Sequence, residues 1–378
     1  MNAPCSSTPS LTERGYRMPA EWEPHEATWL AYPFDPGSRR DAHRHWPNGV
    51  FKRRGIEEQW ADMARSLAPS EAVNIIVRNI EAWGRLHKVF NQVSAGLAEH
   101  RNVRTHFVAN NWSWIRDTGG IFLVNDQTGE RCITDWAFNG WGKEPWKSEC
   151  DLDNQVPFQM AKIAGVERHT IAQVLEGGSI DVNGTGSLLT TEECLLNENR
   201  LLPGEQRRTK EDVERTLCEN LGVENVLWLE RGIGGDDTSG HIDDLTRFVS
   251  RDTVITMVAP RSSGEDHRVL KRNLQRLEAM RNERGRQLSV IEVPLPKPDS
   301  LWGLQLPMSY ANFYIGNDVV LAPVFNDPND AKALGALQQA FPDRRIIDLY
   351  AKDLVWGLGT YHCSTQQEPA PLHPVAEK

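Results

Sequence analysis

The chain has 378 residues, of which 39% are hydrophobic, and it carries a formal net charge of -10 at pH 7. This apolar content, with thirteen Trp, is enough for a substantial core. The acidic balance excludes the usual nucleic-acid binder, because contacts to phosphate need a positive face. An acidic protein suits a cationic partner instead.

The sequence also indicates where the protein works. No apolar run approaches the roughly 18 residues that a membrane span needs. The first residues lack the basic and apolar regions of a signal peptide. The six cysteines form no C-x-x-C pair, which favours reduced thiols. We therefore expect a cytoplasmic protein with no membrane partner.

Secondary structure is expected along most of the chain. Residues 1–15 are polar and rich in Pro and Ser, and we expect a flexible lead-in there. After this lead-in, apolar residues at helical or alternating spacing predict a series of helices and strands. In chain order these are a strand at 27–32, a helix at 56–67, a strand at 73–77, a helix at 81–99, a strand at 103–108, a helix at 209–221, a strand at 226–229, a helix at 265–284, a strand at 288–293, a helix at 330–340 and a strand at 345–349. Residues 35–54 are charged and turn-rich, and 139–155 are irregular.

Four hairpins are expected where two short apolar runs flank a turn. They pair 121–125 with 131–136, 175–182 with 187–191, 246–249 with 253–258, and 312–315 with 318–321. Together with the helices, they give a recurring unit of polar loop, hairpin, helix and strand. Such a repeat buries its faces against its neighbours, so about five radial units would carry their loops to one central mouth. We expect one ring-like α/β domain.

Four of the expected loops carry a group that can do chemistry: Asp117, Glu176, the pair His241 and Asp243, and the thiol Cys363. The first three markers are 59 and 65 residues apart, and His241 and Cys363 are 122 apart. Each has a plain alternative. Cys363 could be a buried hydrophobe, Asp117 a turn cap, Glu176 a loop charge and His241 a structural histidine. His241 and Asp243 are two apart, so on a strand they would face the same side.

The combination favours one kind of substrate. A thiol attacks as thiolate, and carboxylates beside it would oppose that charge unless the substrate is positive. A guanidinium is planar, permanently cationic and pairs with carboxylates through two hydrogen bonds. We therefore infer attack of a cysteine on a guanidinium carbon.

Several motifs resemble those of the agmatine deiminases, which belong with the bacterial-type peptidylarginine deiminases in the guanidino-modifying enzyme superfamily. They are Met18-Pro-Ala-Glu-Trp-Glu-Pro-His-Glu, Trp114-Ile-Arg-Asp-Thr-Gly, Glu176-Gly-Gly-Ser-Ile-Asp-Val-Asn-Gly, Gly234-Gly-Asp-Asp-Thr-Ser-Gly-His-Ile-Asp and His362-Cys-x-Thr-Gln-Gln. The resemblance implies a single domain at 16–369, followed by a tail at 370–378. Its fold would be a five-bladed pseudo-symmetric α/β propeller (pentein fold).

The resemblance also implies the chemistry. Cys363 would be the nucleophile that forms a covalent thiouronium, and His241 the acid and base. Glu176, Asp243 and Asp117 would grip the guanidinium, and Trp114 would wall the site. The reaction would be agmatine plus water giving N-carbamoylputrescine and ammonia, a step of polyamine and putrescine biosynthesis, without a metal or other cofactor. The partner is a small cationic guanidine, and a homo-oligomer is left open.

Three alternatives stay open at this point. The substrate could be free or peptide-bound arginine, or another alkylguanidine. The protein could be a metal-dependent hydrolase that uses His241, Asp243, His362 and a carboxylate as ligands. It could also be a binding protein on an enzyme scaffold that has lost its activity.

Overall fold

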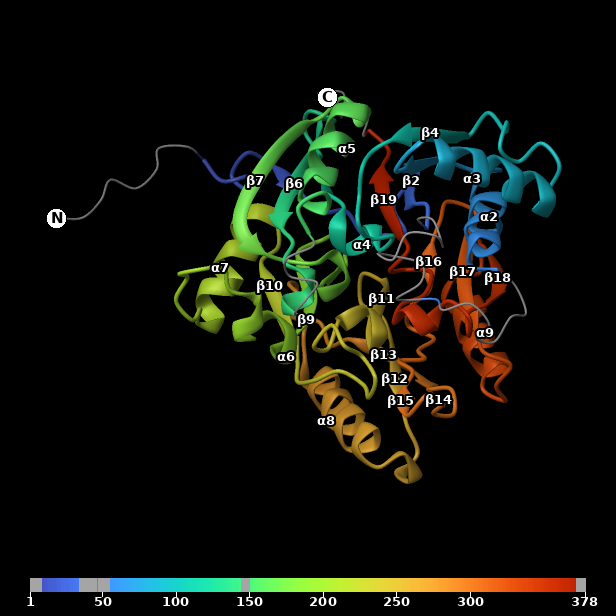
Figure 1. The fold of residues 1–378 in the computed structure, drawn as a ribbon. Helices are drawn as coiled ribbons and strands as arrows, with labels where there is room; N and C mark the ends of the chain where they lie inside the picture. Colours follow the sequence, from blue (N-terminus) through green and yellow to red (C-terminus); the bar gives the residue numbers. More distant parts are fainter. Residues whose placement is uncertain (1–8, 34–45, 47–54, 144–149, 372–378) are drawn as a thin grey trace.

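The computed structural model describes residues 9–33, 46, 55–143 and 150–371. It is a mixed α/β structure in which five sheets share one plan (Figure 1). In each, two antiparallel strands are followed by a strand parallel to the second of them. The sheets are β1 (Tyr16–Arg17), β5 (Ile121–Asn125), β6 (Arg131–Ala137) and β7 (Glu167–Val174); β8 (Asp181–Val182), β9 (Ser187–Thr191) and β10 (Asn225–Leu229); β11 (Thr246–Ser250), β12 (Thr253–Val258) and β13 (Ser289–Pro294); β16 (Tyr314–Ile315), β17 (Val319–Val324) and β18 (Arg345–Tyr350); and β19 (Thr365–Pro369), β2 (His25–Ala31), β3 (Ala72–Val77) and β4 (Val103–Phe107).

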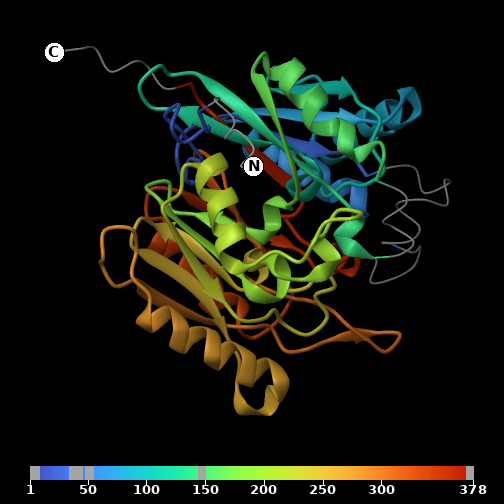
Figure 2. The same ribbon diagram turned by 90° about the vertical axis from the view of Figure 1, so that its left-hand side faces the viewer.

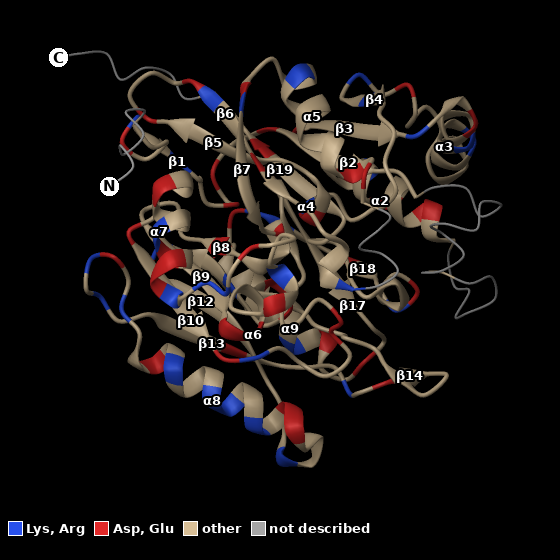
Figure 3. Cartoon of the chain, turned by 60° about the vertical axis from the view of Figure 1, so that its left-hand side comes forward, with Lys and Arg blue, Asp and Glu red and all other residues tan. Residues whose placement is uncertain are grey.

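Helices make the crossovers between parallel strands, as parallel pairing requires. Five of them connect the second strand of an antiparallel pair to the third strand of the same sheet, and the sixth, α3, connects β3 to β4. They are α2 (Ile56–Leu67), α3 (Ile80–Val93), α5 (Val156–Ala164), α7 (Lys210–Leu221), α8 (Glu265–Ala279) and α9 (Asp330–Ala340). Figure 2 shows α8 along the outside of the molecule, and Figure 3 shows acidic and basic residues interspersed along it.

Short elements occupy the connections. Two one-turn helices are α4 (Ile115–Thr118) and α6 (Glu192–Leu195), and a two-stranded ribbon pairs β14 (Ser300–Leu301) with β15 (Leu304–Gln305). The 3-10 turns are η1 (Gly140–Gly142), η3 (Asp153–Gln155), η4 (Gly177–Ser179), η5 (Glu198–Arg200), η6 (Ile242–Asp244), η7 (Arg261–Ser263) and η8 (Val355–Gly357). Asp243 lies in η6, and Glu176 and His241 directly precede η4 and η6.

The two ends of the chain meet in one sheet. Strand β19 pairs antiparallel with β2, with Thr365 opposite Leu30, so red and blue ribbons lie side by side in Figure 1. The sequence analysis predicted no strand here, because Gln366, Gln367 and Glu368 are polar. All three are buried. Glu368 accepts the indole N–H of Trp29 at 2.8 Å, which offsets the cost of burying its carboxylate.

Most other predicted elements are confirmed. The helices expected at 56–67 and 330–340 have the predicted bounds, and all four hairpins form, three of them with small differences in their bounds. The helices expected at 81–99 and 265–284 end early, at Val93 and Ala279. The run 175–182 is wrong as a continuous strand, because its glycines form η4 and leave only β8 extended. Helix α5 and strand β7 were missed, and most of residues 35–54 lie outside the described part.

The part of the lead-in that is described packs against the body. Leu11 is buried, and the backbone N–H of Thr12 donates to the carbonyl of Glu219 in α7. The cysteines of the described residues are free thiols, as the sequence predicted. Within the described ranges, no helix combines the length and apolarity that crossing a membrane would take.

Candidate active site

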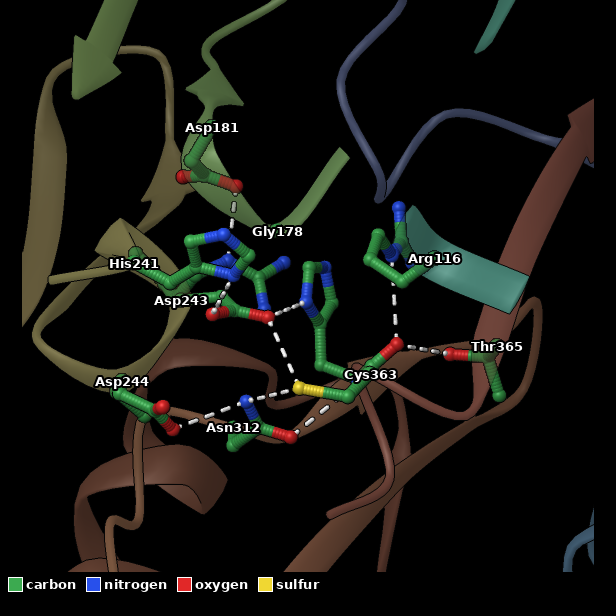
Figure 4. A network of polar contacts seen from close by, with 12 residues as sticks. Arg116, Gly178, Asp181, His241, Asp243, Asp244, Asn312, Cys363 and Thr365 are labelled. Atoms are coloured by element: carbon green, nitrogen blue, oxygen red, sulfur yellow. Dashed lines mark hydrogen bonds and ion pairs between the residues drawn. The ribbon is translucent and has the colours of Figure 1, made fainter. Parts of the chain in front are cut away.

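Four loops that precede hairpins or the final strand bring the predicted residues together. Asp117 lies in α4 before β5, Glu176 lies just before η4, His241 and Asp243 flank the start of η6, and Cys363 lies just before β19. All five are buried, with Cys363 and Asp117 the most accessible at 6% each. Figure 4 shows the thiol pointing toward Asp243 and Asn312, with His241 behind that carboxylate.

The thiol of Cys363 is held between an amide and a carboxylate. Nδ2 of Asn312 donates to Sγ at 3.1 Å, and Sγ lies 3.4 Å from Oδ2 of Asp243. Burial raises the pKa of the Cys363 thiol well above its usual value, and the charges of Asp243, Asp244 and Asp117 raise it further. The free protein therefore holds a neutral thiol that needs a nearby positive charge to ionise.

The imidazole of His241 lies within 4.0 Å of three carboxylates. Nδ1 is 4.0 Å from Oδ1 of Asp117 and from Oδ1 of Asp243, and Nε2 is 4.0 Å from Oε2 of Glu176. Burial would lower its pKa, but Asp117, Cys194 and Glu176 hold it well above the usual value. His241 is thus an imidazolium that can give up a proton.

The predicted pairing of His241 with Asp243 is correct in space but wrong in its reason. We expected a strand, on which residues two apart face the same side. Residues 242–244 instead form the turn η6, which His241 precedes. The carboxylate of Asp236 fixes the start of this turn by accepting the backbone N–H groups of Gly240 and His241 at 2.9 and 3.0 Å.

Asp117 is fixed by two donors. Its Oδ2 accepts the indole N–H of Trp141 at 2.9 Å, and its Oδ1 accepts the backbone N–H of Gly178 at 3.0 Å. Burial raises the pKa of Asp117, with Asp243 and Glu176 adding to the effect and His241 opposing it. A guanidinium bound here would restore the charged form.

Glu176 has a cationic partner that the sequence analysis did not assign. Nε of Arg200 lies 2.7 Å from its Oε1, and the guanidinium also donates to the carbonyls of Trp141 and Thr238 at 2.9 and 2.6 Å. Burial would lower the pKa of Arg200, but the Glu176 carboxylate raises it. Arg200 therefore orients Glu176 and joins three loops.

A second buried network lies behind the thiol. Nδ1 of His362 is 2.7 Å from Oδ2 of Asp243, and its Nε2 is 3.0 Å from Oε2 of Glu21. Burial would raise the pKa of Asp243, but the hydrogen bond and charge of His362 lower it. The carboxylate of Asp243 is therefore ionised beside the thiol.

Glu21 is the residue that the sequence analysis missed most clearly. Its carboxylate lies 3.1 Å from Arg116 and 3.1 Å from Arg247, in addition to His362. Burial would raise its pKa, but Arg247, His362 and Arg116 hold the pKa of Glu21 well below its usual range. The carboxylate of Glu21 in the motif Met18-Pro-Ala-Glu21 was the sequence signal that could have identified this residue.

The thiol opens onto a pocket with aromatic walls. Its lining consists of Trp114, Asp117, Trp141, Asp237, Thr238, Gly357, Leu358, Gly359 and Cys363. Trp114, which the resemblance implies as a wall of the site, is one of these lining residues. Gly359 is required by close approach, because a Cβ there would meet Sγ of Cys363 at 3.0 Å.

One group of side chains could hold a metal ion. The ligand atoms of Glu176, Cys194 and His241 lie within 4.8 Å of one another, and all three residues are buried. The guanidinium of Arg200 already neutralises Glu176, which weakens the attraction of this group for a cation. The ligand set His241, Asp243 and His362 is not among the groups of three or more found in the described residues.

Comparison with known proteins identifies the family of this site. Residues 17–369 match the family described as Porphyromonas-type peptidyl-arginine deiminase. The chain belongs to this family. An agmatine deiminase of Ectopseudomonas mendocina is 34% identical, and the match covers 94% of this chain and 96% of that protein.

Solved structures of the deiminase family agree with this assignment. The agmatine deiminase of Enterococcus faecalis has a TM-score of 0.83 at 31% identity, over 98% of this chain and 100% of that one. A variant agmatine deiminase of C. jejuni, solved with substrate bound, has a TM-score of 0.81 at 28% identity, over 95% of this chain and 97% of that one. The shared fold covers the whole candidate site.

Proposed function

We propose that the protein is a hydrolase that converts agmatine and water into N-carbamoylputrescine and ammonia. The observation that carries this proposal is the clustering of one thiol, one imidazolium and three carboxylates, with Cys363 and Asp117 of this cluster lining a single aromatic pocket. Relatives named agmatine deiminase, similar over nearly the full chain, support the choice of substrate. The small cationic guanidine supplies the positive charge that the acidic site lacks.

In the proposed mechanism, the carboxylates of Asp117 and Asp243 hold the two edges of the guanidinium. Its positive charge favours ionisation of Cys363, which releases its proton to solvent, and the thiolate attacks the guanidinium carbon. The neutral tetrahedral adduct takes a proton from His241 onto one nitrogen and loses ammonia. A cationic thiouronium remains bonded to sulfur.

The second half of the reaction uses water. Neutral His241 removes a proton from a water molecule that attacks the thiouronium carbon. Collapse of this adduct forms the carbonyl, breaks the carbon–sulfur bond and returns the thiolate. The proton released balances conversion of ammonia to ammonium, so the cationic guanidinium becomes a neutral ureido group. Glu176, oriented by Arg200, stabilises the imidazole of His241 in the steps where it is charged.

We also propose that the five sheets are blades of a closed five-bladed propeller. Two observations support closure. The sheets repeat one plan, and β19 returns to complete the sheet that β2 begins. Closure would explain why loops far apart in sequence share one mouth.

The test is release of ammonia from agmatine by the wild-type protein and by Cys363→Ala. We expect turnover by the wild type and a loss of at least about a thousand-fold in the variant. Cys218→Ala, which removes a half-buried thiol in α7, is the matched control and should keep its activity. Retained turnover in Cys363→Ala would refute the mechanism.

A substrate panel and a chelator complete the test. Agmatine should be turned over much faster than arginine, N-blocked arginine or C-blocked arginine. Faster turnover of free or blocked arginine than of agmatine would show that arginine is the substrate. Activity that persists in a metal-free preparation with chelator is expected, and its loss would favour the metal-dependent hydrolase.

A further inference from the structure

The pocket holds a second acidic side chain that the proposed chemistry does not use. The lining contains two carboxylates, Asp117 beside the thiol and Asp237. Asp236, the preceding residue, is committed to the turn before His241. Burial raises the pKa of Asp237, while Lys143 opposes that rise. The charged form of Asp237 therefore depends on a neighbouring cation.

That cation is a lysine from a different loop. Nζ of Lys143 lies 3.4 Å from Oδ2 of Asp237, and the two side chains are 35% and 25% exposed. Lys143 directly follows η1, the turn that also carries Trp141. Its backbone N–H donates to the carbonyl of Gly140 at 3.1 Å. A Cβ on the neighbouring Gly142 would meet the carbonyl oxygen of Asn199 at 2.4 Å, so this turn is tightly packed.

A fixed turn changes the character of the ion pair. A flexible surface lysine loses much side-chain entropy when it pairs. Here the same turn places the indole of Trp141 on Asp117 and the ammonium of Lys143 on Asp237. The lysine side chain thus reaches the wall of the substrate pocket from an anchored backbone.

The proposed substrate carries the same chemical group as this lysine. Agmatine is a dication, with a guanidinium at one end of a four-carbon chain and a primary ammonium at the other. When the guanidinium lies on Asp117, the chain must leave along the pocket, where Asp237 is the other carboxylate of the lining. Two ammonium groups that share one carboxylate repel each other.

We propose that Lys143 is a tethered competitor that occupies Asp237 and must leave it when the ammonium of the substrate binds. Lys143 is then a specificity residue: it weakens binding of guanidines with a cationic tail relative to guanidines with a neutral tail. This inference rests on the proposed function, since it assigns the far end of that substrate.

The experiment measures binding rather than turnover. In a Cys363→Ala background, calorimetry at low ionic strength and mildly alkaline pH gives dissociation constants for agmatine and n-butylguanidine, which has the same chain but no ammonium. Lys143→Met should tighten agmatine binding about five-fold and change n-butylguanidine binding less than about two-fold. Lys143→Arg, which keeps the cation, should resemble the parent.

Two further variants separate this effect from a general change in charge. Lys210→Met removes a lysine of similar exposure, 37%, that pairs with Glu192 at 3.2 Å, and it should change neither constant. Asp237→Asn should weaken agmatine about ten-fold and remove the effect of Lys143→Met.

Several results would overturn the proposal. These are that Lys143→Met tightens both ligands equally, that it leaves agmatine binding unchanged, or that it weakens binding of a guanidine with a carboxylate tail, which would make Lys143 an anion-binding residue. Failure of the proposed function has a separate signature, because it shows as absent ammonia release in the protein with Cys363 intact. The binding ratio is read without that reaction.

Discussion

The carboxylate of Asp243 lies 3.4 Å from the sulfur of Cys363, a contact drawn as a dashed line in Figure 4. The same oxygen of this carboxylate, Oδ2, lies 2.7 Å from Nδ1 of His362, whose hydrogen bond and charge keep Asp243 ionised. An ionised carboxylate disfavours the thiolate, so the nucleophile rests in its unreactive form. A bound guanidinium reverses that balance, and this limits reaction of the thiol with other electrophiles.

Asp243→Asn should therefore separate thiol reactivity from catalysis. Removing the negative charge lowers the pKa of Cys363, so iodoacetamide should label it about ten-fold faster at neutral pH. Ammonia release should fall about a hundred-fold or more, because one edge of the guanidinium loses its carboxylate. Mass spectrometry of the peptide that contains Cys363 measures the labelling. Unchanged or slower labelling would contradict the assigned effect of Asp243.

Glu21→Gln should destabilise the protein severely. The substitution leaves Arg116 and Arg247 buried without their shared carboxylate, which costs about 3–5 kcal/mol of unfolding free energy. Since the folded pKa of Glu21 is lowered, its contribution is present above its unfolded pKa and is lost as pH falls through the folded value. The difference between variant and wild type in denaturant should shrink on acidification.

Glu23→Gln is the matched control for that measurement. Glu23 pairs with Arg17 at 2.8 Å, but its side chain is 25% exposed. Water therefore screens the pair, and the loss should be about 1 kcal/mol or less. Equal losses of unfolding free energy for the two variants would show that the buried Glu21 contributes no more than the partly exposed partner of an ordinary ion pair.

The fold was predictable where local pattern decides the structure. Helix α2 shows its apolar stripe in sequence, and β17 shows its β-branched run beside a turn. Strand β19 has no such pattern, because the polar side chains of Gln367 and Glu368 are buried through partners far away in sequence. Strand β7 begins with exposed charged residues, so it lacked alternation.

The residues of the site, like the elements of the fold, were predictable where a local sequence pattern carries them. Cys363, His241 and the three carboxylates lie in motifs readable as letters. The pairs of residues that orient these side chains cannot be recognised from the sequence motifs. Glu21 and His362 are 341 positions apart, and Arg200 meets Glu176 only through the packing of two loops. Such pairings depend on tertiary structure, which periodicity does not encode.

Gly178→Ala should impair catalysis while leaving the fold intact. An added Cβ would lie 2.7 Å from Nδ1 of His241 and 2.9 Å from Oδ1 of Asp117, so both side chains must move. We expect ammonia release to fall about a hundred-fold, since small displacements of reacting groups have large effects. Gly335→Ala in α9, where a Cβ meets nothing within 4 Å, is the control and should keep activity and gain about 0.5–1 kcal/mol of stability. Equal activity in both variants would show that the contact with His241 is unimportant.

Asp153→Asn should change how stability depends on pH. Oδ1 of Asp153 accepts the backbone N–H groups of Asn111 and Trp112, both at 3.0 Å, and Oδ2 has no hydrogen-bond partner among the described residues. Burial raises the pKa of Asp153 to about 7. Folding therefore takes up a proton between the unfolded pKa and about 7, and the wild type loses stability as pH rises through that window.

An asparagine at this position keeps the acceptor for both N–H groups but cannot titrate. Compared with the wild type, Asp153→Asn should therefore gain about 4 kcal/mol of unfolding free energy between a pH below the unfolded pKa of about 4 and a pH above about 7, as a raised pKa of this size implies. Denaturant unfolding at a series of pH values measures the gain. Asp318→Asn, at an exposed position, serves as the control with a nearly constant difference. A constant difference for Asp153→Asn as well would mean that the buried carboxyl is ionised throughout.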